Sequence, residues 1–257
     1  MTDTYFRPID ILYACIHAMV YNGVYLAWLF VTRSLPVHEP KFNVRPTTEN
    51  EVALVTGSSS GIGYQTAREL AVNYGMTVII ACRSRDRSMV AAESINAQIA
   101  SRLGGTNKRG RAVVVHALDL SSFTSVRGFA AAVKRQYKTI HVLVNNAGTL
   151  GGRVIASEGG LDLTFQTNYL GHFLLTAQLM DVFADQARIL NLSSLGHHFC
   201  GGYNVEDPNF WRSCAMAGQR PDKTYLFSKL AQLLFTTELN RRYADRIRSI
   251  AINPGVV

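Results

Sequence analysis

Cysteine is scarce in this chain of 257 residues, and the few cysteines are widely spaced. Four are present, and no two of them form a C-x-x-C pair: Cys15, Cys82, Cys200 and Cys214. This spacing indicates neither a disulfide framework nor a redox motif, so a reducing compartment is favoured. His197 and His198 stand near the last two cysteines, but the spacing matches no structural zinc pattern, and we predict no metal site.

Charged residues are also few, at 17%, and acidic residues are outnumbered by basic ones, 18 to 26, which gives a net charge of +8. With 47% hydrophobic residues, the composition is typical of a globular chain rather than a disordered one. A basic surface suits nucleic acid, anionic lipid or an anionic cofactor. The longest basic cluster, at 108–111, lies beside glycines and is interpreted as a solvated loop. No nucleic-acid motif is present, so we predict no nucleic-acid partner.

No charge interrupts residues 11–32, which would measure about 33 Å as a helix, enough for a hydrocarbon core of about 30 Å. Aromatic residues stand near both ends of the segment, as at membrane interfaces. We predict a membrane-anchor helix here, with a linker that completes an N-terminal region over 1–48. A helix lying on the membrane surface is an alternative. A cleavable signal peptide is another, although the apolar stretch is long and follows Asp3 and Asp10.

The charges around this segment predict its orientation. Arg33, Lys41 and Arg45 follow it, so the basic excess lies on its C-terminal side. By the positive-inside rule, that side is cytoplasmic. The prediction is therefore a protein anchored in the endoplasmic reticulum or another intracellular membrane, with a cytoplasmic domain over 49–257.

Strand and helix patterns alternate from residue 51 onward. Short apolar runs predict strands at 51–56, 77–82, 112–118, 140–144, 187–192 and 247–252. Helices are predicted over 62–74, 86–102, 122–137, 161–183 and 222–243, with a long loop before the last of them. Continuous apolar strands alternating with helices indicate a parallel sheet covered on both faces, so the fold class is a Rossmann-like, doubly wound α/β domain.

A glycine-rich turn follows the first predicted strand directly. Residues 56–63 read TGSSSGIG, a G-x-x-x-G-x-G spacing rather than the G-x-G-x-x-G of the common fingerprint. Glycines allow a tight turn and let backbone N–H groups approach a diphosphate, while the helix that follows adds positive potential. The loop residues predicted to contact a dinucleotide are Gly57, Ser59, Ser60, Gly61, Ile62 and Gly63.

An acidic residue is missing where an NAD-specific enzyme needs one. The second strand ends at Cys82 and is followed by Arg83, whose guanidinium can pair with a 2′-phosphate. We therefore predict NADP(H) as the cofactor, with a solvated arginine as the alternative. Asp119, at the end of the third strand, faces the adenine or caps the next helix.

Three motifs, in this order, carry a resemblance to the short-chain dehydrogenase/reductase family. They are the glycine turn, Asp119-Leu120 and NNAG over 145–148. FQTNYLGHFLLT (165–176) and ILNLSSLGHH (189–198) resemble the retinol dehydrogenase-like branch. The resemblance covers 51–257. It implies that NNAG supports the sheet beside the cofactor, and it adds these cofactor contacts: Leu120, Asn146, Ala147, Gly148, Tyr225, Lys229, Pro254 and Gly255.

Tyr225 and Lys229 lie four residues apart, so on a helix they share a face. Reduction of a carbonyl needs a proton donor at its oxygen, and oxidation of an alcohol needs an acceptor. A neighbouring lysine cation stabilises the tyrosinate anion that such exchange requires. The pair therefore predicts a general acid/base.

Ser194 ends the fifth strand and could orient the substrate oxygen toward that tyrosine. Ser193 is the competing choice, because the pattern does not say which serine ends the strand; the resemblance favours Ser194. The resemblance also gives Asn168 a role. It implies that Asn168 bends its helix and holds a water between the lysine and bulk solvent.

The sequence ends at Val257, directly after the sixth strand, whereas the family continues with a substrate-covering segment and a final strand. The expectation is either a truncated chain or a pocket without its lid. The predicted function is hydride transfer between NADP(H) and a lipophilic alcohol or carbonyl, such as a retinoid, steroid or fatty aldehyde. A non-enzymatic dinucleotide sensor or scaffold is the alternative.

Overall fold

The computed structural model describes residues 51–102, 110–150, 156–157, 159–200, 206–216 and 221–255. The chain divides into two units, Met1–Arg45 and Pro46–Val257, and all described residues belong to the second. The anchor predicted over 11–32 lies outside the described residues. Within them, no helix combines the length and the apolar character that crossing a bilayer requires.

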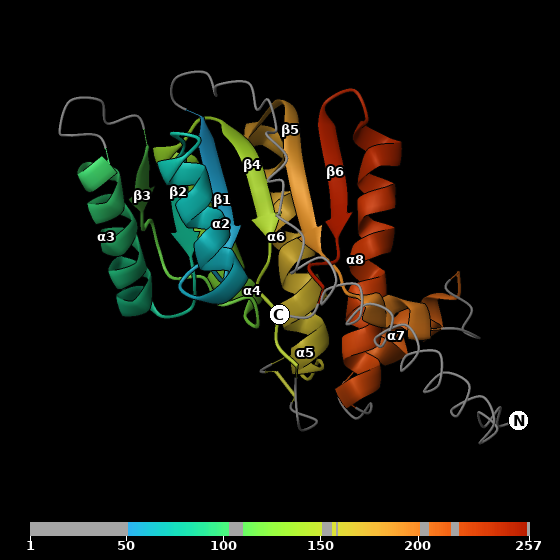
Figure 1. Ribbon diagram of the computed structural model, residues 1–257. Helices are drawn as coiled ribbons and strands as arrows, with labels where there is room; N and C mark the ends of the chain where they lie inside the picture. Colours follow the sequence, from blue (N-terminus) through green and yellow to red (C-terminus); the bar gives the residue numbers. More distant parts are fainter. Residues whose placement is uncertain are drawn as a thin grey trace, which may run out of the picture. The chain divides into compact units, whose positions relative to one another are not determined.

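Six parallel strands form one sheet in the order β3-β2-β1-β4-β5-β6 (Figure 1). The strands are β1 (Val52–Thr56), β2 (Thr77–Ala81), β3 (Arg111–Val113), β4 (Ile140–Asn145), β5 (Phe183–Leu192) and β6 (Ile247–Ile252). The order reverses between β1 and β4, which pair directly. In open α/β sheets, ligands bind beyond the carboxyl ends of the strands at such a reversal.

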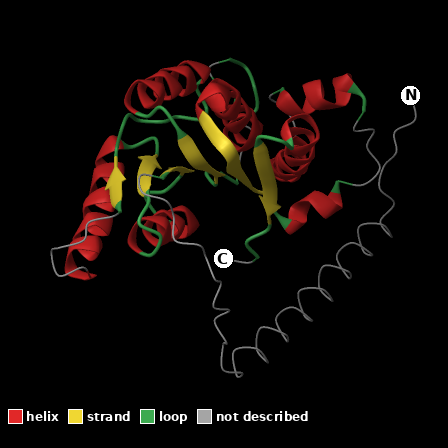
Figure 2. Ribbon diagram, turned by 90° about the horizontal axis from the view of Figure 1, so that it is seen from above, coloured by secondary structure: helices red, strands yellow, loops and turns green. Residues whose placement is uncertain are grey.

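Helices cover both faces of the sheet (Figure 2). They are α2 (Gly61–Val72), α3 (Arg85–Arg102), α4 (Phe123–Gln136), α5 (Leu163–Phe165), α6 (Gly171–Leu179), α7 (Pro208–Ala215) and α8 (Pro221–Tyr243). Alternate residues of β1 point to opposite sides. Leu54 packs in a core with α4, α6 and α8, whereas Val55 packs in a second core with α2 and α3. The predicted doubly wound, Rossmann-like fold is therefore confirmed.

Several predicted boundaries differ from those observed. The third strand, expected over 112–118, ends at Val113, because β3 is an edge strand that pairs only with the first half of β2. The loop expected before the last helix contains the helix α7 and a 3₁₀ turn, Leu195–Phe199. Phe210 of α7 packs edge-on against Phe227 of α8 at 5.0 Å between ring centroids, which holds this short helix against the longer one.

The helix predicted over 161–183 is four helical segments rather than one. Asp162 caps α5, accepting a hydrogen bond from the Phe165 amide at 2.9 Å. A π-helical turn, Gln166–Leu170, then leads into α6. A 3₁₀ turn, Met180–Val182, ends the helical region, and β5 begins at Phe183, earlier than expected. The π turn widens the helix at Asn168, because its hydrogen bonds span one residue more than those of an α-helix.

A buried polar seam crosses the sheet. The Asn145 amide donates to Asn191 Oδ1 at 2.8 Å, and the Asn191 amide donates to Thr236 at 2.9 Å and Ser249 at 3.2 Å. These side chains come from β4, β5, α8 and β6. The seam therefore joins three neighbouring strands to the helix that carries Tyr225.

Candidate active site

The glycine turn lies at the reversal of strand order, between β1 and α2. Gly57 and Gly61 have φ of +66° and +56°, a conformation that side chains disfavour. A Cβ at Gly57 would lie 2.9 Å from the Ala147 backbone, and one at Gly63 would lie 2.4 Å from Asn146 Nδ2. Glycine is therefore required at both positions, because the NNAG segment packs directly against the turn.

Gly61, the second glycine of the turn, leaves room for a ligand. A Cβ built on Gly61 would meet nothing within 4 Å, and the residue is exposed. Ser60 precedes α2 in an extended conformation, and its side chain does not cap the helix. Ser59 and Ile62 are half-buried. The N-terminus of α2 therefore has no side-chain cap, and the space beside Gly61 is open. Such a helix N-terminus fits the diphosphate of a dinucleotide.

Arg83 follows β2 at the same edge of the sheet. Its side chain is exposed and makes no ion pair within the part of the chain that the structure describes, so the guanidinium is available to an anion.

Asp119 does not cap the next helix. Ser122 caps α4, accepting from the Ser125 amide at 3.3 Å, whereas Asp119 Oδ1 accepts from Ser121 N at 2.9 Å and Ser121 Oγ at 2.6 Å. Of the two roles open to Asp119, the helix cap therefore falls to Ser122. Leu120 is buried beside it, and its carbonyl lies 2.4 Å from where a Cβ of Gly171 would stand.

Thr56 ties the NNAG segment to the turn, and the sequence analysis overlooked it. Its hydroxyl accepts hydrogen bonds from the backbone amides of Asn146 and Ala147, both at 2.9 Å. The Asn146 side chain donates to the Thr56 carbonyl at 2.7 Å. The only available signal was its place directly before Gly57.

Tyr225, Lys229 and Ser194 approach one another beyond the ends of β4 and β5. A Cβ at Gly196 would lie 3.6 Å from Ser194 Oγ and 3.8 Å from the Tyr225 ring. The side chains of Ser194 and Tyr225 therefore lie on the same side of Gly196, close to each other. Lys229 Nζ lies 5.6 Å from the centroid of the Tyr225 ring. Tyr225 and Ser194 are half-buried, which leaves both hydroxyls within reach of a substrate.

The two adjacent serines have different surroundings. Ser193 is buried, and its hydroxyl donates to the backbone carbonyl of Lys229 at 2.9 Å. Ser194 is half-buried, and its hydroxyl accepts from the Gly196 amide at 3.2 Å, so its proton stays available. The geometry thus favours Ser194 as the serine that meets a substrate.

Lys229 is buried, with 5% of its surface exposed, and its ammonium donates to the Leu192 carbonyl at 2.7 Å. Burial lowers the pKa of Lys229 to about 8. An ammonium has three N–H donors, so two remain for groups on the open side. A Cβ at Gly148 would lie 3.7 Å from the ammonium, which places the NNAG segment against it.

Asn168 lies in the π turn, fully buried. Its side chain accepts from the Thr149 amide at 2.8 Å and donates to the Thr149 carbonyl at 3.0 Å and to Ser228 at 3.1 Å. Its backbone carbonyl contacts His172 Nδ1 at 2.9 Å and accepts from the Gln232 amide at 2.6 Å. The bend implied by the resemblance is present; the carbonyl is occupied by two side chains that the sequence analysis did not single out.

Pro254 and Gly255 follow β6 at the same edge. Pro254 is exposed, Gly255 has φ of +79°, and its amide donates to Asn253 Oδ1 at 3.2 Å. The predicted cofactor contacts therefore come from the segments that follow five strands, β1, β2, β3, β4 and β6, and from α8.

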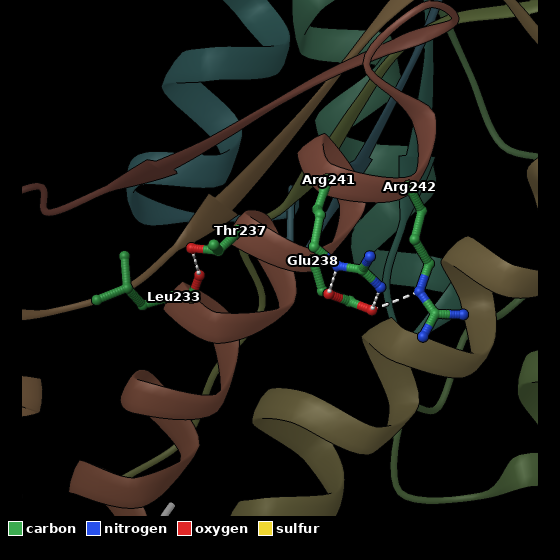
Figure 3. Close-up of polar contacts among 5 residues, drawn as sticks. All are labelled: Leu233, Thr237, Glu238, Arg241 and Arg242. Carbon is green, nitrogen blue, oxygen red and sulfur yellow. Dashed lines mark hydrogen bonds and ion pairs between the residues drawn. The ribbon is translucent and has the colours of Figure 1, made fainter. Parts of the chain in front are cut away.

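A separate apolar groove of about 310 Å³ lies between the π turn, α6 and α8, lined by Phe173 and Phe235 among others. None of Ser194, Tyr225 and Lys229 lines it. Its one acidic residue, Glu238, is bound by Arg241 at 2.7 Å and by Arg242 (Figure 3). These bonds hold the pKa of Glu238 far below its usual value, so this carboxylate is unsuited to proton exchange near neutral pH.

Comparison with known proteins agrees with this geometry. The family model for short chain dehydrogenases matches residues 51–201. Retinol dehydrogenase 13 of Mus musculus is 40% identical over 215 residues, 82% of this chain and 60% of that protein. Retinol dehydrogenase 11 of Homo sapiens is 35% identical over 212 residues, 80% of this chain and 61% of that protein. The chain thus spans about 60% of the length of these curated relatives.

Solved structures show the same arrangement. A crystal structure of an uncharacterised protein from Mycobacterium paratuberculosis superposes with a TM-score of 0.64 at 36% identity, over 82% of this chain and 70% of that one. The Pseudomonas aeruginosa RhlG/NADP active-site complex gives 0.62 at 25% identity, over 82% and 74%. With its matched family model, sheet order and glycine turn, the chain belongs to the short-chain dehydrogenase/reductase family of oxidoreductases, whose fold binds a nicotinamide dinucleotide, and it is similar to the retinol dehydrogenase branch.

Proposed function

We propose that this protein transfers a hydride between NADP(H) and a lipophilic alcohol or carbonyl, with Tyr225 as the general acid/base. The observation that carries the proposal is the convergence of Ser194, Tyr225 and Lys229 beside the glycine turn. A proton donor, an orienting hydroxyl and a cation at one edge of the sheet are the groups that carbonyl reduction needs.

The cofactor would be held from the glycine turn to the end of α8. Gly57, Gly61 and the N-terminus of α2 would bind the diphosphate, and the free guanidinium of Arg83 would pair with a 2′-phosphate. Lys229 would donate to the nicotinamide ribose with the N–H groups that Leu192 leaves unused. When bound, the cofactor supplies or accepts the hydride.

The protein's own residues would manage the proton. Ser194 would donate a hydrogen bond to the substrate oxygen and hold it near the Tyr225 hydroxyl. Tyr225 would give its proton to that oxygen during reduction and take it back during oxidation. Lys229, as a cation, would stabilise the tyrosinate that remains. Asn168, through Thr149 and Ser228, would fix the π turn against α8.

A lipophilic substrate is supported by exposed apolar side chains at the same edge. Leu150, after β4, is 69% exposed, and Phe199, after β5, is 45% exposed. Large exposed hydrophobic residues near a site often mark a surface that binds apolar ligands. The names of the curated relatives point to retinol as one member of this class. We therefore propose a retinoid, steroid or fatty aldehyde as substrate.

We propose also that residues 11–32 anchor the protein in an intracellular membrane, with residues 49–257 on the cytoplasmic side. The length and the lack of charge of the segment support an anchor, and the basic residues that follow support the orientation. Retention in the membrane fraction after an alkaline wash is the expected result. Release by that wash would contradict it, and protease protection of residues 49–257 in sealed vesicles would contradict the orientation.

Tyr225→Phe in the full-length protein tests the assignment of the acid/base. The change removes one hydroxyl and keeps the ring, so NADPH affinity should stay the same while kcat with retinal falls at least about 100-fold. Lys229→Ala should weaken NADPH binding as well. Tyr243→Phe is the matched control, because this tyrosine ends the same helix about 27 Å away. It should leave kcat unchanged.

The outcome also separates the two candidate functions. Turnover by Tyr225→Phe within a few-fold of the unchanged protein would show that another group donates the proton. If the unchanged protein binds NADPH yet reduces no lipophilic carbonyl in a substrate screen, the protein is a dinucleotide-binding sensor or scaffold instead.

A further inference from the structure

His172 is a buried histidine that none of the proposed chemical steps uses. It lies on α6, one turn after Asn168, with 1% of its surface exposed. Its ring spans two parts of the site. Nδ1 lies 2.9 Å from the Asn168 carbonyl, and Nε2 lies 2.8 Å from the Thr56 hydroxyl, 116 residues away in sequence.

The contacts determine which ring nitrogen carries the proton. A carbonyl oxygen can only accept, so Nδ1 of His172 must be the donor to Asn168. In a neutral ring, Nε2 is then an acceptor, and the Thr56 hydroxyl must donate to it. The Val144 carbonyl also lies within reach of the Thr56 proton, at 3.3 Å, but Nε2 at 2.8 Å is the nearer acceptor. The histidine therefore draws the Thr56 hydroxyl toward itself.

That orientation matters because the Thr56 oxygen is fully used. With its proton directed at His172, its two lone pairs accept the backbone amides of Asn146 and Ala147 at 2.9 Å each. An imidazolium would direct a third N–H at this oxygen, which has no lone pair left. The arrangement thus requires a neutral ring, and burial lowers the pKa of His172 to about 4.

The other end of the bridge reaches the catalytic helix. The Asn168 carbonyl that receives His172 also accepts from Gln232, which lies one turn after Lys229 on α8. The Asn168 side chain binds Ser228, the residue before that lysine. A continuous set of hydrogen bonds therefore runs from the end of β1 through His172 to the helix that carries Tyr225 and Lys229.

We propose that His172 is a positioning residue that holds the cofactor-binding turn and NNAG segment in register with the catalytic helix. The inference rests on the proposed function. The proposal predicts that loss of His172 leaves the Thr56 hydroxyl, and with it the amides of Asn146 and Ala147, less firmly held. Dinucleotide binding should therefore weaken, although His172 itself does not contact the dinucleotide.

A double-mutant cycle on NADPH affinity tests the bridge. His172→Phe keeps a ring and removes both contacts, and it should raise the NADPH dissociation constant about tenfold, as expected for the loss of buried hydrogen bonds. Thr56→Val should do the same, whereas Thr56→Ser, which keeps the hydroxyl, should bind normally. Because the two residues act through one bond, the double variant should be no weaker than the weaker single variant.

Three results would overturn the proposal. The first is an affinity of His172→Phe within twofold of the unchanged protein, which is what a purely structural role predicts once the folded fraction is corrected for. The second is independent, multiplying effects of the two changes. The third comes from nitrogen NMR of the unchanged protein: a proton on Nε2 of His172, in place of Nδ1, would contradict the bridge even if a variant failed to fold.

The same measurements keep the two proposals apart. Dinucleotide affinity and the protonated nitrogen are read without any turnover. A protein that binds NADPH with the expected coupling but reduces no carbonyl would refute the proposed reaction and leave the positioning role intact. A protein that turns over normally after His172→Phe, with unchanged affinity, would refute only the positioning role.

Discussion

At the scale of single residues, the two adjacent serines after β5 have different surroundings and therefore different expected roles. Ser193 gives its hydroxyl proton to the backbone of Lys229, inside the protein. Ser194 keeps its proton available and lies close to the Tyr225 ring. Exposure and hydrogen bonding separate the two, whereas the alternation of residues along the strand does not.

This difference predicts opposite effects for the same substitution. Ser194→Ala should lower kcat about 100-fold or more and leave thermal stability nearly unchanged, because it removes an orienting donor to the substrate. Ser193→Ala should reduce the free energy of unfolding by about 1 kcal/mol, because the Lys229 carbonyl loses its buried partner. Steady-state kinetics and urea unfolding of both variants measure the contrast. Equal losses of kcat would contradict it.

Arg83 is expected to select the cofactor. Its exposed guanidinium has no ion pair within the described part of the chain, so a 2′-phosphate would gain a partner without breaking one. Arg83→Asp should weaken NADPH binding at least about tenfold, by removing that bond and adding repulsion, and should spare NADH. Arg135→Asp changes the net charge equally at the far end of α4 and should alter neither affinity. Equal NADPH and NADH affinities in the unchanged protein would refute the role of Arg83.

Sequence could predict the residues that belong to compact motifs. The glycine turn and the Tyr225–Lys229 pair are short patterns. Their spacing indicates diphosphate binding for the turn and proton exchange for the pair. Thr56 and His172 were missed because their importance comes from a bond across 116 positions, which no local pattern reveals. The strand pattern could not separate Ser193 from Ser194; the family resemblance favoured Ser194, and the burial of the two side chains differs.

At the scale of elements, the polar seam across β4, β5 and β6 is the feature that sequence least suggested. An amide in the middle of an apolar strand, such as Asn191 in β5, is acceptable only if every polar atom finds a partner. Here the amide meets Asn145, Thr236 and Ser249, which come from three other elements. The bonds fix the strands relative to α8, and with it the height of Tyr225 above the sheet.

Asn191→Leu should therefore destabilise the protein, although leucine has a similar volume. It would leave the Asn145 amide without its 2.8 Å partner and remove the donor to two hydroxyls, which should reduce the free energy of unfolding by about 2–4 kcal/mol. Thr237→Val is the control. Its hydroxyl bonds the Leu233 carbonyl on the exposed side of α8 (Figure 3), so its loss should be within about 0.5 kcal/mol. Urea unfolding compares them, and similar losses would contradict a role for the seam.

Element types were predictable and boundaries less so. Apolar runs identified all six strands of the described sheet, because parallel strands buried on both faces need such runs. The length of the edge strand β3 was overestimated, because that length depends on pairing with β2 rather than on the residues of β3 alone. The π turn at Asn168 has no signature in helical periodicity; only the family resemblance indicated a bend there.

At the scale of the whole molecule, His172 makes stability depend on pH. Its pKa is about 6.5 in an unfolded chain and about 4 in the folded one, where burial and the Lys229 cation disfavour a second positive charge. Above pH 6.5 both states are neutral at this ring, and its full contribution is present. As pH falls toward 4, only the unfolded chain takes up the proton, so the folded state loses stability.

The expected slope is a decrease of roughly 1.4 kcal/mol in the free energy of unfolding per pH unit within that window. His172→Gln should flatten this part of the profile, because glutamine does not titrate. His116→Gln, which removes an exposed histidine, should leave the slope as it is. Urea unfolding between pH 4 and 7 provides the comparison. Parallel profiles for the His172 variant and the unchanged protein would show that the ring takes up a proton in the folded state.

The order of the strands also determines when the sheet can be completed during synthesis. One edge of β1 pairs with β2, which follows it closely in sequence. The other edge pairs with β4, and Val144 of β4 comes 88 residues after Thr56 of β1. At about 5–20 residues per second, the ribosome needs roughly 4–18 seconds to deliver that partner. During this interval the nascent chain presents the unpaired backbone edge of a largely apolar strand, which invites pairing with other chains. The reversal of strand order that creates the cofactor crevice therefore also leaves the half-made protein open to pairing with other chains until β4 is synthesised.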